Sequence, residues 1–465
     1  MKAHPEPFQK EGVRIIEQHG RGLIADEMGL GKTYQSLLIA RRNPSWLPQV
    51  VVCPAIVKWN WEKEALEKVG LRASVCEGQT PPELKSGIWR GGDSPLFIIN
   101  YEILKYWVPY FRQIGIKSLV LDECQNVTNR LAQRTKAART LAKGCEHVLG
   151  LSGTPMTNRP AEMFSILNMI WPDEFSQFWD FANRYCRPRI TPWGWDFSGA
   201  ANIDELNERL LKLGMVRRKL AEVKSEMPAI RRSVVLCDLI DEREYRRAYD
   251  DVVAFVKGKD PHLYRAAKQG GGFFRVGYLM RLAAKLKMRA VCSWVNNFLE
   301  NTDRKIVLFT VHRGAAEVLE KRINGQSVVI NGGVSHKDRK MRIAQFTRDP
   351  KVRVTVASMR ACATGLDGLQ RAASDAAFVE IGPTPAIHRQ AEARLDRMGQ
   401  TMPVSSSYLV GRGTIEQQAC LMLQRKQDIS SHVLDGRNVK NELDIHRELI
   451  RLVDREKYHG SSIEA

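Results

Sequence analysis

Short apolar runs alternate with helical patterns in the first third of this 465-residue chain. Each run holds four or five residues, the length of a buried strand. The runs lie at residues 50–53, 96–99, 118–121 and 147–151. Alternating short strands and helices are typical of crossover units that feed a parallel sheet. The pattern predicts an α/β sheet and stops after Thr157.

The same alternation returns in the last third, with apolar runs near residues 305, 327, 352, 376 and 405. Between the two regions, residues 159–213 read as mostly helical and contain several tryptophans, and a charged helix-like stretch follows from residue 240. The segment QGGGFF at 269–274 reads as a flexible connection. After Thr414 the pattern is helical to about Glu456, followed by a polar tail.

We therefore expect an α/β protein with two tandem parallel-sheet lobes, helical protrusions between them and a C-terminal helical extension. The first lobe is expected at 1–230 and includes the protrusion 159–213. Residues 231–300 are expected to form a second protrusion and hinge, 301–435 the second lobe and 436–465 the C-terminal helix and tail. Because the first lobe begins close to the N-terminus and the second ends soon before the C-terminus, we expect the two lobes to carry no accessory modules.

The segment RGLIADEMGLGKT at residues 21–33 has the pattern of a phosphate-binding loop between a strand and a helix. Gly29 and Gly31 allow a tight turn in which backbone N–H groups face a polyphosphate. Lys32 is placed to reach the β and γ phosphates, and Thr33 to bring its hydroxyl to magnesium. Asp26 departs from the usual pattern, since it stands where the first glycine belongs. A structural turn is the alternative interpretation.

Two adjacent carboxylates follow the apolar run of LVLDECQ at 119–125. Ligands of open parallel sheets bind at the carboxyl ends of strands. Asp122 is therefore a candidate to hold magnesium through its water shell, and Glu123 to polarise the attacking water. A solvated turn is the alternative for an isolated Asp-Glu pair.

Two further segments carry candidate chemistry. Ser152 and Thr154 of LSGTPMTNRP, at 151–160, are candidates to couple the γ-phosphate to a polymer site, although a simple strand-to-helix loop would look the same. Gln390, Arg394 and Arg397 have helical i, i+4, i+7 spacing, which predicts that they share one face. Two arginines on one face suit fingers that reach the γ-phosphate when lobes close. An exposed surface stripe is the alternative.

The net charge narrows the class of partner that the protein can bind. The net charge is +19 and is spread along the chain, which favours a folded protein with a basic face for a polyanion such as nucleic acid.

Nine cysteines lack any CxxC pair, so we expect free thiols and no structural zinc. The N-terminal residues lack the apolar core of a signal peptide, and no apolar run is long enough for a membrane span. We expect an intracellular, cytoplasmic monomer, with a nuclear location left open.

Taken in order along the chain, these segments resemble the motifs of superfamily II helicases of the Swi/Snf-like branch. The matching segments are FQKEGV, DEMGLGKT, DECQ, LSGTP, ATGLDGLQRA at 363–372, QAEARLDRMGQ and GTIEQQ at 413–418. Within that branch, residues 184–206 and 215–223 resemble the HepA-related annealing helicases, although a packing cluster of the helical protrusion is the alternative there. The resemblance implies two RecA-like lobes, ATP with Mg²⁺ in the cleft between them, and movement along duplex DNA.

The resemblance also assigns roles to individual residues. Gln9 would read adenine with support from Phe8. The phosphates would be held by Gly29, Leu30, Gly31, Lys32 and Thr33. Gly365 and Asp367 would lie beside the ribose or the γ-phosphate. The site would be closed by Gln390, Arg394 and Arg397. Cys124 and Gln125 replace the commoner Ala-His of the DEAH box, and Gln125 could still hydrogen-bond to the third motif.

Candidate DNA contacts follow strands on the expected sheet edges. In the first lobe they are Lys58, in VVVCPAIVKWNWEKE at 50–64, and Asn100 and Tyr101, whereas Trp59 and Trp61 are expected to pack in the core. In the second lobe they are His312, Arg313 and Arg360. The resulting hypothesis is an ATP-dependent translocase on double-stranded or forked DNA. A strand-separating DNA or RNA helicase and a nucleotide-switched DNA-binding clamp remain as alternatives.

Overall fold

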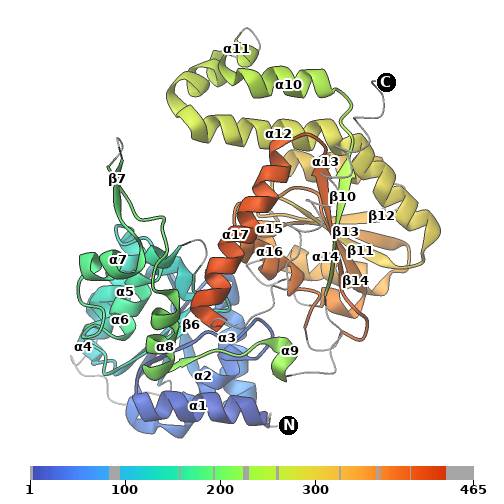
Figure 1. Cartoon of the computed structure of the whole chain (residues 1–465). Helices are drawn as coiled ribbons and strands as arrows, with labels where there is room; N and C mark the ends of the chain where they lie inside the picture. Colours follow the sequence, from blue (N-terminus) through green and yellow to red (C-terminus); the bar gives the residue numbers. More distant parts are fainter. Residues whose placement is uncertain are drawn as a thin grey trace. The chain divides into compact units, whose positions relative to one another are not determined.

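The computed structural model describes residues 4–82, 95–156, 159–191, 194–223, 230–257, 261–323, 326–362, 366, 368–397 and 400–435. The chain forms two compact units. The first comprises Met1–Glu226 and Asp428–Lys440, and the second Met227–Gln427 and Asn441–Ala465. Each unit contains its own parallel sheet (Figure 1). The α/β class with two RecA-like lobes is therefore confirmed.

The sheet of the first unit has the strand order β3-β4-β2-β5-β6-β1-β9, and all neighbouring strands are parallel. Its strands are β1 (Gly22–Ile24), β2 (Gln49–Cys53), β3 (Ala73–Val75), β4 (Leu96–Asn100), β5 (Ser118–Asp122), β6 (His147–Leu151) and β9 (Met215–Val216). The four apolar runs predicted in this region correspond to β2, β4, β5 and β6.

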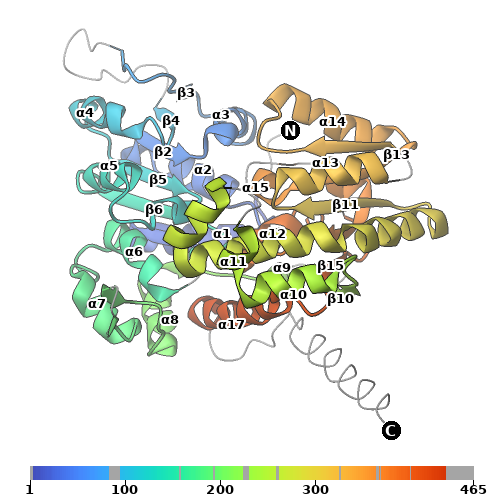
Figure 2. The ribbon, with the colours of Figure 1, turned by 90° about the horizontal axis from the view of Figure 1, so that it is seen from above.

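Helices cover both faces of this sheet because its strand residues alternate between two cores. Val50 and Val52 belong to one core, whereas Val51 and Cys53 belong to the other. The first core is completed by α4 (Leu104–Ile114), α5 (Gln133–Ala142), α6 (Phe164–Ile170), α7 (Phe178–Tyr185) and α8 (Ile203–Lys212). The second is completed by α1 (Pro7–His19), α2 (Lys32–Arg42) and α3 (Lys58–Glu64). Figure 2 shows α4, α5 and α6 along one side of the strands and α2 and α3 along the other.

The sheet of the second unit has the order β10-β15-β14-β11-β13-β12 and is also parallel. Its strands are β10 (Arg231–Cys237), β11 (Lys305–Thr310), β12 (Gln326–Ile330), β13 (Val352–Ser358), β14 (Ala373–Phe378) and β15 (Ser405–Gly411). Its helices are α13 (Arg313–Arg322), α14 (His336–Arg348), α15 (Met359–Cys362), α16 (Pro385–Glu392) and α17 (Ile415–Asp435). Here too, Val307 and Phe309 face one core and Ile306 and Leu308 the other.

Strand β10 corrects the prediction that residues 231–300 form only a protrusion and hinge. It pairs with β15 over seven residues, from Arg231 to Cys237. Its start is polar and its burial is partial, as expected at a sheet edge, so its apolar signal is weak. The strand forms by pairing with residues about 170 positions away, so the local sequence could not indicate it.

Helix α12 (Pro261–Asn301) corrects a second prediction, because it continues through the glycines of 269–274 that were interpreted as a flexible connection. It packs on α10 (Glu242–Asp250) and α11 (Val252–Val256) through a core that includes Leu279, Leu282 and Tyr245. An interior glycine costs a helix roughly 1 kcal/mol relative to alanine, and burial of an apolar stripe offsets that cost.

A two-stranded antiparallel ribbon interrupts the stretch 159–213 that was expected to be mostly helical. It consists of β7 (Arg189–Thr191) and β8 (Gly194–Asp196) and belongs to neither parallel sheet. A short helix, α9 (Leu220–Val223), follows the first sheet. Helix α17 is described to Asp435, and the predicted continuation to about Glu456 lies outside the described residues.

Eight of the cysteines are described as buried free thiols. Within the described ranges, no helix combines the length and apolar character needed to cross a membrane.

Candidate functional site

The predicted phosphate loop joins β1 to α2, which begins at Lys32. Gly29 and Gly31 have φ angles of 87° and 73°, a left-handed conformation that side-chain-bearing residues rarely adopt. A Cβ at Gly31 would lie 2.7 Å from the side-chain nitrogen of Gln9. The turn therefore requires glycine here, and a glycine turn at a helix N-terminus is the cradle expected for phosphates. Thr33, the second residue of α2, is half-buried beside it.

Asp26, the residue that replaces the first glycine of the usual pattern, is fully buried and paired. Arg218 donates to its two carboxylate oxygens over 2.9 and 2.8 Å, and Gln35 donates over 2.9 Å. The Arg218 guanidinium also lies 5.2 Å from the Phe8 ring centroid. A buried carboxylate is tolerated only with such partners. Sequence reasoning missed Arg218, although a buried acidic residue in the loop was a signal that a cation must face it.

Lys32 closes onto the loop in this structure. Its ammonium donates to the backbone oxygens of Asp26 and Glu27 over 2.8 and 3.1 Å. Desolvation lowers the pKa of Lys32, while the charges of Glu123, Asp26 and Asp122 oppose that shift. The lysine therefore sits within the electrostatic reach of both predicted catalytic carboxylates.

Asp122 and Glu123 lie at the carboxyl end of β5, as predicted. Asp122 accepts a 2.8 Å hydrogen bond from the Trp61 indole, and burial together with the Glu123 charge raises the pKa of Asp122 to about 7. Glu123 has a φ of 50°, a strained conformation of the kind that concentrates at functional sites.

Two crowded carboxylates favour a cation between or beside them. Oxygen donors such as Asp122, Glu123 and the Thr33 hydroxyl are the ligands that Mg²⁺ prefers. The residues therefore fit the implied magnesium ion.

A chain of hydrogen bonds runs from Glu123 to the third motif. Gln125 donates to the Glu123 carboxylate over 2.7 Å, and the Ser152 hydroxyl donates to the Gln125 carbonyl over 2.6 Å. The backbone N–H of Thr154 donates to the Ser152 hydroxyl over 3.0 Å. The hydrogen bond expected from Gln125 to the third motif is therefore present, and it replaces the contact that a DEAH histidine would make.

Gly153, within the third motif, approaches the phosphate loop closely. A Cβ at this position would lie 2.9 Å from the Met28 side chain and 3.4 Å from the Lys32 ammonium. Arg217, which sequence reasoning missed, donates to the backbone oxygens of Ala25 and Gly153 over 2.7 and 3.4 Å. It thus ties the strand that enters the loop to the third motif.

Arg217 is also anchored from the last turn of α17. Its Nε lies 2.6 Å from an Asp435 carboxylate oxygen, and both side chains are nearly inaccessible. Desolvation opposes the charge, but Asp435 and Glu27 outweigh it and raise the pKa of Arg217.

Gln9 is buried, and its amide is engaged at both ends. Its oxygen accepts from the backbone of Glu6 over 3.1 Å, and its nitrogen donates to the backbone of Leu30 over 3.2 Å. Gln9 therefore holds the phosphate loop here, and recognition of adenine stays a prediction. Gly365 and Asp367 lie outside the described residues.

The prediction that Gln390, Arg394 and Arg397 share one helical face is wrong. Only Gln390 lies in a helix. Helix α16 ends at Glu392, and both arginines lie in the irregular turn that follows. Past Glu392 the backbone N–H groups of Arg394 and Leu395 donate three residues back, to Ala391 and Glu392, so the α-helical pattern stops there. Glu392 itself is buried and pairs with Arg232 of β10 over 2.8 Å. Both arginines are partly exposed and already have protein contacts.

Three predicted DNA contacts of the first unit point inward. The Lys58 ammonium donates to the backbone of Cys76 over 2.8 Å, and only 8% of the residue is exposed. The Tyr101 hydroxyl donates to the backbone of Asp122 over 2.7 Å, and the Asn100 amide binds Glu102 over 2.7 Å. These side chains support the site rather than a polymer. Trp61 is buried as expected, whereas Trp59 is half exposed, contrary to expectation.

The second-unit candidates are more accessible. His312 is the residue before α13, and its ring lies 2.6 Å from Glu380. Arg313 is strongly exposed and pairs with Glu317 over 2.9 Å. Arg360 of α15 is exposed and has no carboxylate partner within the part of the chain that the structure describes. Arg313 and Arg360 are therefore accessible to a polyanion, whereas the His312 ring is engaged by Glu380.

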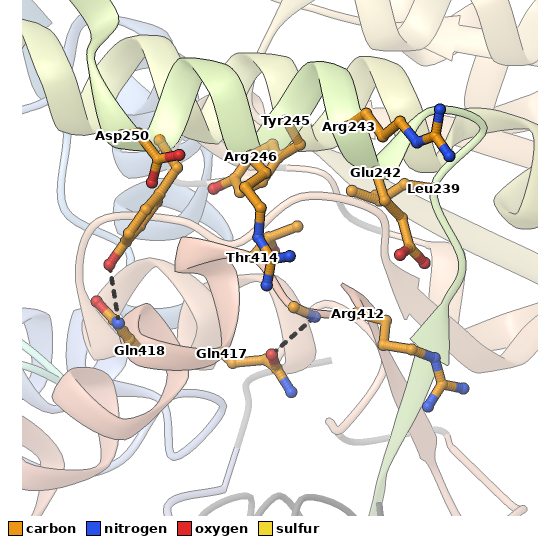
Figure 3. A pocket seen from close by; sticks show the side chains of 12 residues that line it. Leu239, Glu242, Arg243, Tyr245, Arg246, Asp250, Arg412, Thr414, Gln417 and Gln418 are labelled. Atoms are coloured by element: carbon orange, nitrogen blue, oxygen red, sulfur yellow. Dashed lines mark hydrogen bonds between the residues drawn. The ribbon is translucent and has the colours of Figure 1, made fainter. Parts of the chain in front are cut away.

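A separate cavity of about 810 Å³ lies in the second unit between α10 and the start of α17. Figure 3 shows Arg246 reaching from α10 toward Thr414 and Gln417. Three arginines and two carboxylates line this cavity, and Arg412 is further neutralised by Asp238 at 2.7 Å. Part of its lining belongs to the GTIEQQ segment at 413–418, but none of the residues predicted to bind the nucleotide lines it, so the cavity is not part of that site.

Comparison with known proteins places the motif order in a family. The model of the SNF2-related domain matches residues 8–293. A SWI/SNF-related matrix-associated actin-dependent regulator of chromatin subfamily A-like protein 1 from Xenopus tropicalis is 32% identical over 90% of this chain and 44% of its own length. The human DNA annealing helicase and endonuclease ZRANB3 is 28% identical over 95% of this chain and 41% of its own length.

Among solved structures, the Sulfolobus solfataricus SWI2/SNF2 ATPase core in complex with dsDNA covers 93% of this chain and 94% of its own, with 24% identity and a TM-score of 0.43. The chain spans less than half the length of the two curated relatives named. Because the domain match covers more than half of the chain, the protein belongs to the SNF2-related family.

Proposed function

We propose that this chain is an ATP-dependent motor that moves along double-stranded DNA and uses the movement to remodel forks or duplexes or to anneal strands. The observation that carries the proposal is the hydrogen-bonded chain from Glu123 through Gln125 to Ser152. It links the carboxylate beside the phosphate loop to the third motif. The names of the relatives, an annealing helicase among them, support DNA as the polymer.

The chain's own residues divide the hydrolysis between them. The glycine turn and Lys32 bind and neutralise the phosphates, and Glu123 orients the attacking water and takes its proton. Asp122 and Thr33 would hold magnesium, which supplies further charge neutralisation at the phosphates. Because Gln125 binds both Glu123 and Ser152, a shift of the catalytic carboxylate is transmitted to the third motif.

Two parts of the second unit complete the proposed motor. Arg394 and Arg397 act as arginine fingers that stabilise charge in the transition state. His312, Arg313 and Arg360 contact the phosphate backbone, which makes binding strongly salt-dependent and largely independent of sequence.

The deciding experiment compares ATP hydrolysis without nucleic acid and with single-stranded DNA, duplex DNA, forked DNA and RNA. We expect the largest rise with duplex or forked DNA, ATP-driven displacement of a third strand from a triplex, and rewinding of a single-stranded bubble. Lys32→Ala should abolish hydrolysis, whereas Glu123→Gln should bind ATP without turnover. Unwinding of a tailed duplex without triplex displacement would indicate a conventional helicase, and stimulation by RNA alone an RNA-acting enzyme.

A further inference from the structure

The β7–β8 ribbon exposes apolar side chains in a part of the first unit that the nucleotide site does not use. Figure 1 shows the ribbon standing out beyond α7. Ile190 and Trp195 face each other across its two strands, and they are 76% and 50% exposed. A two-stranded ribbon is marginally stable by itself, so large apolar side chains left in water on it need an explanation.

The ribbon is held in a defined position. Trp195 meets Trp179 edge to face with ring centroids 4.9 Å apart and lies nearly parallel to Phe197 at 6.4 Å. Phe197 in turn packs on Phe178 at 4.9 Å. Arg189 pairs with Asp196 over 2.7 Å across the strands. Trp179, like Trp195, is about half exposed, so the two indoles form a fixed, solvent-accessible platform.

Positive charge borders this platform. The guanidinium of Arg130 lies 3.6 Å from the Phe178 ring centroid, and the charge of Arg139 reaches it. Two nitrogen atoms of the Arg139 guanidinium are buried without a hydrogen-bond partner. Among the described residues, no carboxylate pairs with Arg130 or Arg139. Guanidinium groups without a carboxylate partner are suited to bind phosphate.

We propose that the ribbon platform binds unpaired nucleotides, with a base stacked on Trp195 and Trp179 and the adjoining phosphate on Arg130. Stacking on aromatic side chains requires a free base face, which a duplex hides inside its own stack. The arginine border favours a nucleic acid over an apolar protein surface. This site is distinct from the proposed duplex-tracking contacts and does not depend on ATP, so it can be tested whether or not the motor proposal holds.

Photocrosslinking to the full-length chain gives a local test. An oligodeoxythymidine that carries 5-bromodeoxyuridine is expected to crosslink to Trp195 or Trp179, as identified by mass spectrometry. The matching oligoribonucleotide separates DNA from RNA, which share the required base and phosphate. A blunt duplex of the same length should not crosslink there. Equal crosslinking of the blunt duplex at Trp195 would overturn the assignment to unpaired bases.

Three substitutions at one position separate stacking from apolar contact. Trp195→Ala should weaken binding of the single-stranded oligonucleotide roughly fivefold or more, because a stacked base contributes about 1–3 kcal/mol. Trp195→Phe should keep most of the affinity, whereas Trp195→Leu, which stays apolar, should lose it. Tyr106→Ala removes another exposed aromatic side chain of the first unit and should leave the affinity unchanged.

Thermal unfolding of each variant shows whether the fold is intact. If Trp195→Ala is unfolded, the comparison of Trp195→Phe with Trp195→Leu still decides the matter. Equal affinity of these two variants would overturn the stacking site and leave a protein-docking surface as the explanation for the ribbon.

Discussion

In the first unit the residues around the phosphate loop are held by internal hydrogen bonds, whereas the basic candidates of the second unit lie at the surface. Lys32, Asp122 and Gln125 each contact a protein group before any ligand is bound. Arg313 and Arg360, in contrast, are exposed. Catalysis requires groups fixed in advance at the reacting centre. Tracking a polymer backbone requires charge that can meet successive phosphates.

The buried ion pairs of the two units also differ in what they hold in place. In the first unit, Arg217 links the nucleotide loop to Asp435, and Arg218 pairs with Asp26 of the loop itself. In the second unit, the fully buried pair Lys287–Glu416 joins α12 to the start of α17. The first pairs support a reactive site, and the second supports only the fold. The four tests below compare the two units, beginning with the largest expected effect.

Arg394→Ala and Arg397→Ala should reduce kcat by about 10³-fold or more while ATP affinity changes little, because arginine fingers contribute roughly 10³ to 10⁵ in related phosphoryl transfers. Single-turnover hydrolysis and equilibrium nucleotide binding measure the two quantities. Arg348→Ala, an exposed arginine of the same unit that lies outside the helicase-like motifs, is the matched control. Normal turnover by both variants would confine the chemistry to the first unit.

Glu416→Ala should destabilise the second unit by about 3–5 kcal/mol, because it leaves the Lys287 ammonium buried without its partner. Hydrogen exchange of the α12 backbone amides reports on this unit alone. The double variant Lys287→Met/Glu416→Leu should recover most of the protection, since no charge is left buried. If Glu416→Ala exchanges as slowly as the wild type, the pair has no structural role.

Gln125→Ala should lower DNA-stimulated hydrolysis by about tenfold, because it removes hydrogen bonds of about 1.5–3 kcal/mol to the charged Glu123 and also releases Ser152. ATP binding should be retained. Gln125→His, the commoner residue of the DEAH box, should keep more activity than alanine. Equal rates for all three proteins would show that the link to the third motif does not contribute to turnover.

Arg360→Ala should lower the slope of log K against log salt for duplex binding by about 1 without changing the melting temperature, as expected for one lost phosphate contact. Lys58→Met should instead lower the melting temperature and leave the salt slope unchanged, because the Lys58 ammonium is bonded to the Cys76 backbone inside the fold. Salt titrations by fluorescence anisotropy and thermal unfolding distinguish them. An unchanged slope for Arg360→Ala would remove it from the proposed DNA path.

Much of the fold could be predicted from local pattern. The run KIVLFT coincides with β11, and the runs of the first unit coincide with its central strands. Buried strands of a parallel sheet are apolar on both faces, so each is visible as a continuous run. Edge strand β10 was missed, and the continuity of helix α12 through residues 269–274 was not predicted, because both depend on partners distant in sequence.

The candidate site shows the same division. The spacing of the phosphate loop and of Asp122 and Glu123 predicted which residues meet at the sheet edge, because parallel strands bring their carboxyl ends together. Spacing did not predict that Lys58 and Tyr101 turn inward or that α16 stops before Arg394. Those outcomes depend on which distant carbonyl or carboxylate lies within reach of each side chain.

The sequence by itself determined the α/β class, the order of the helicase-like motifs and the residues of the phosphate loop and of the adjoining strand end, since these follow from periodicity and from short-range turn chemistry. Only the tertiary structure decided how the charges are paired, as with Arg218 on Asp26, Arg217 on Asp435 and Lys287 on Glu416. Partners 129 to 218 positions apart leave no periodic signal. They are selected because a buried charge must find its counter-ion in the folded chain.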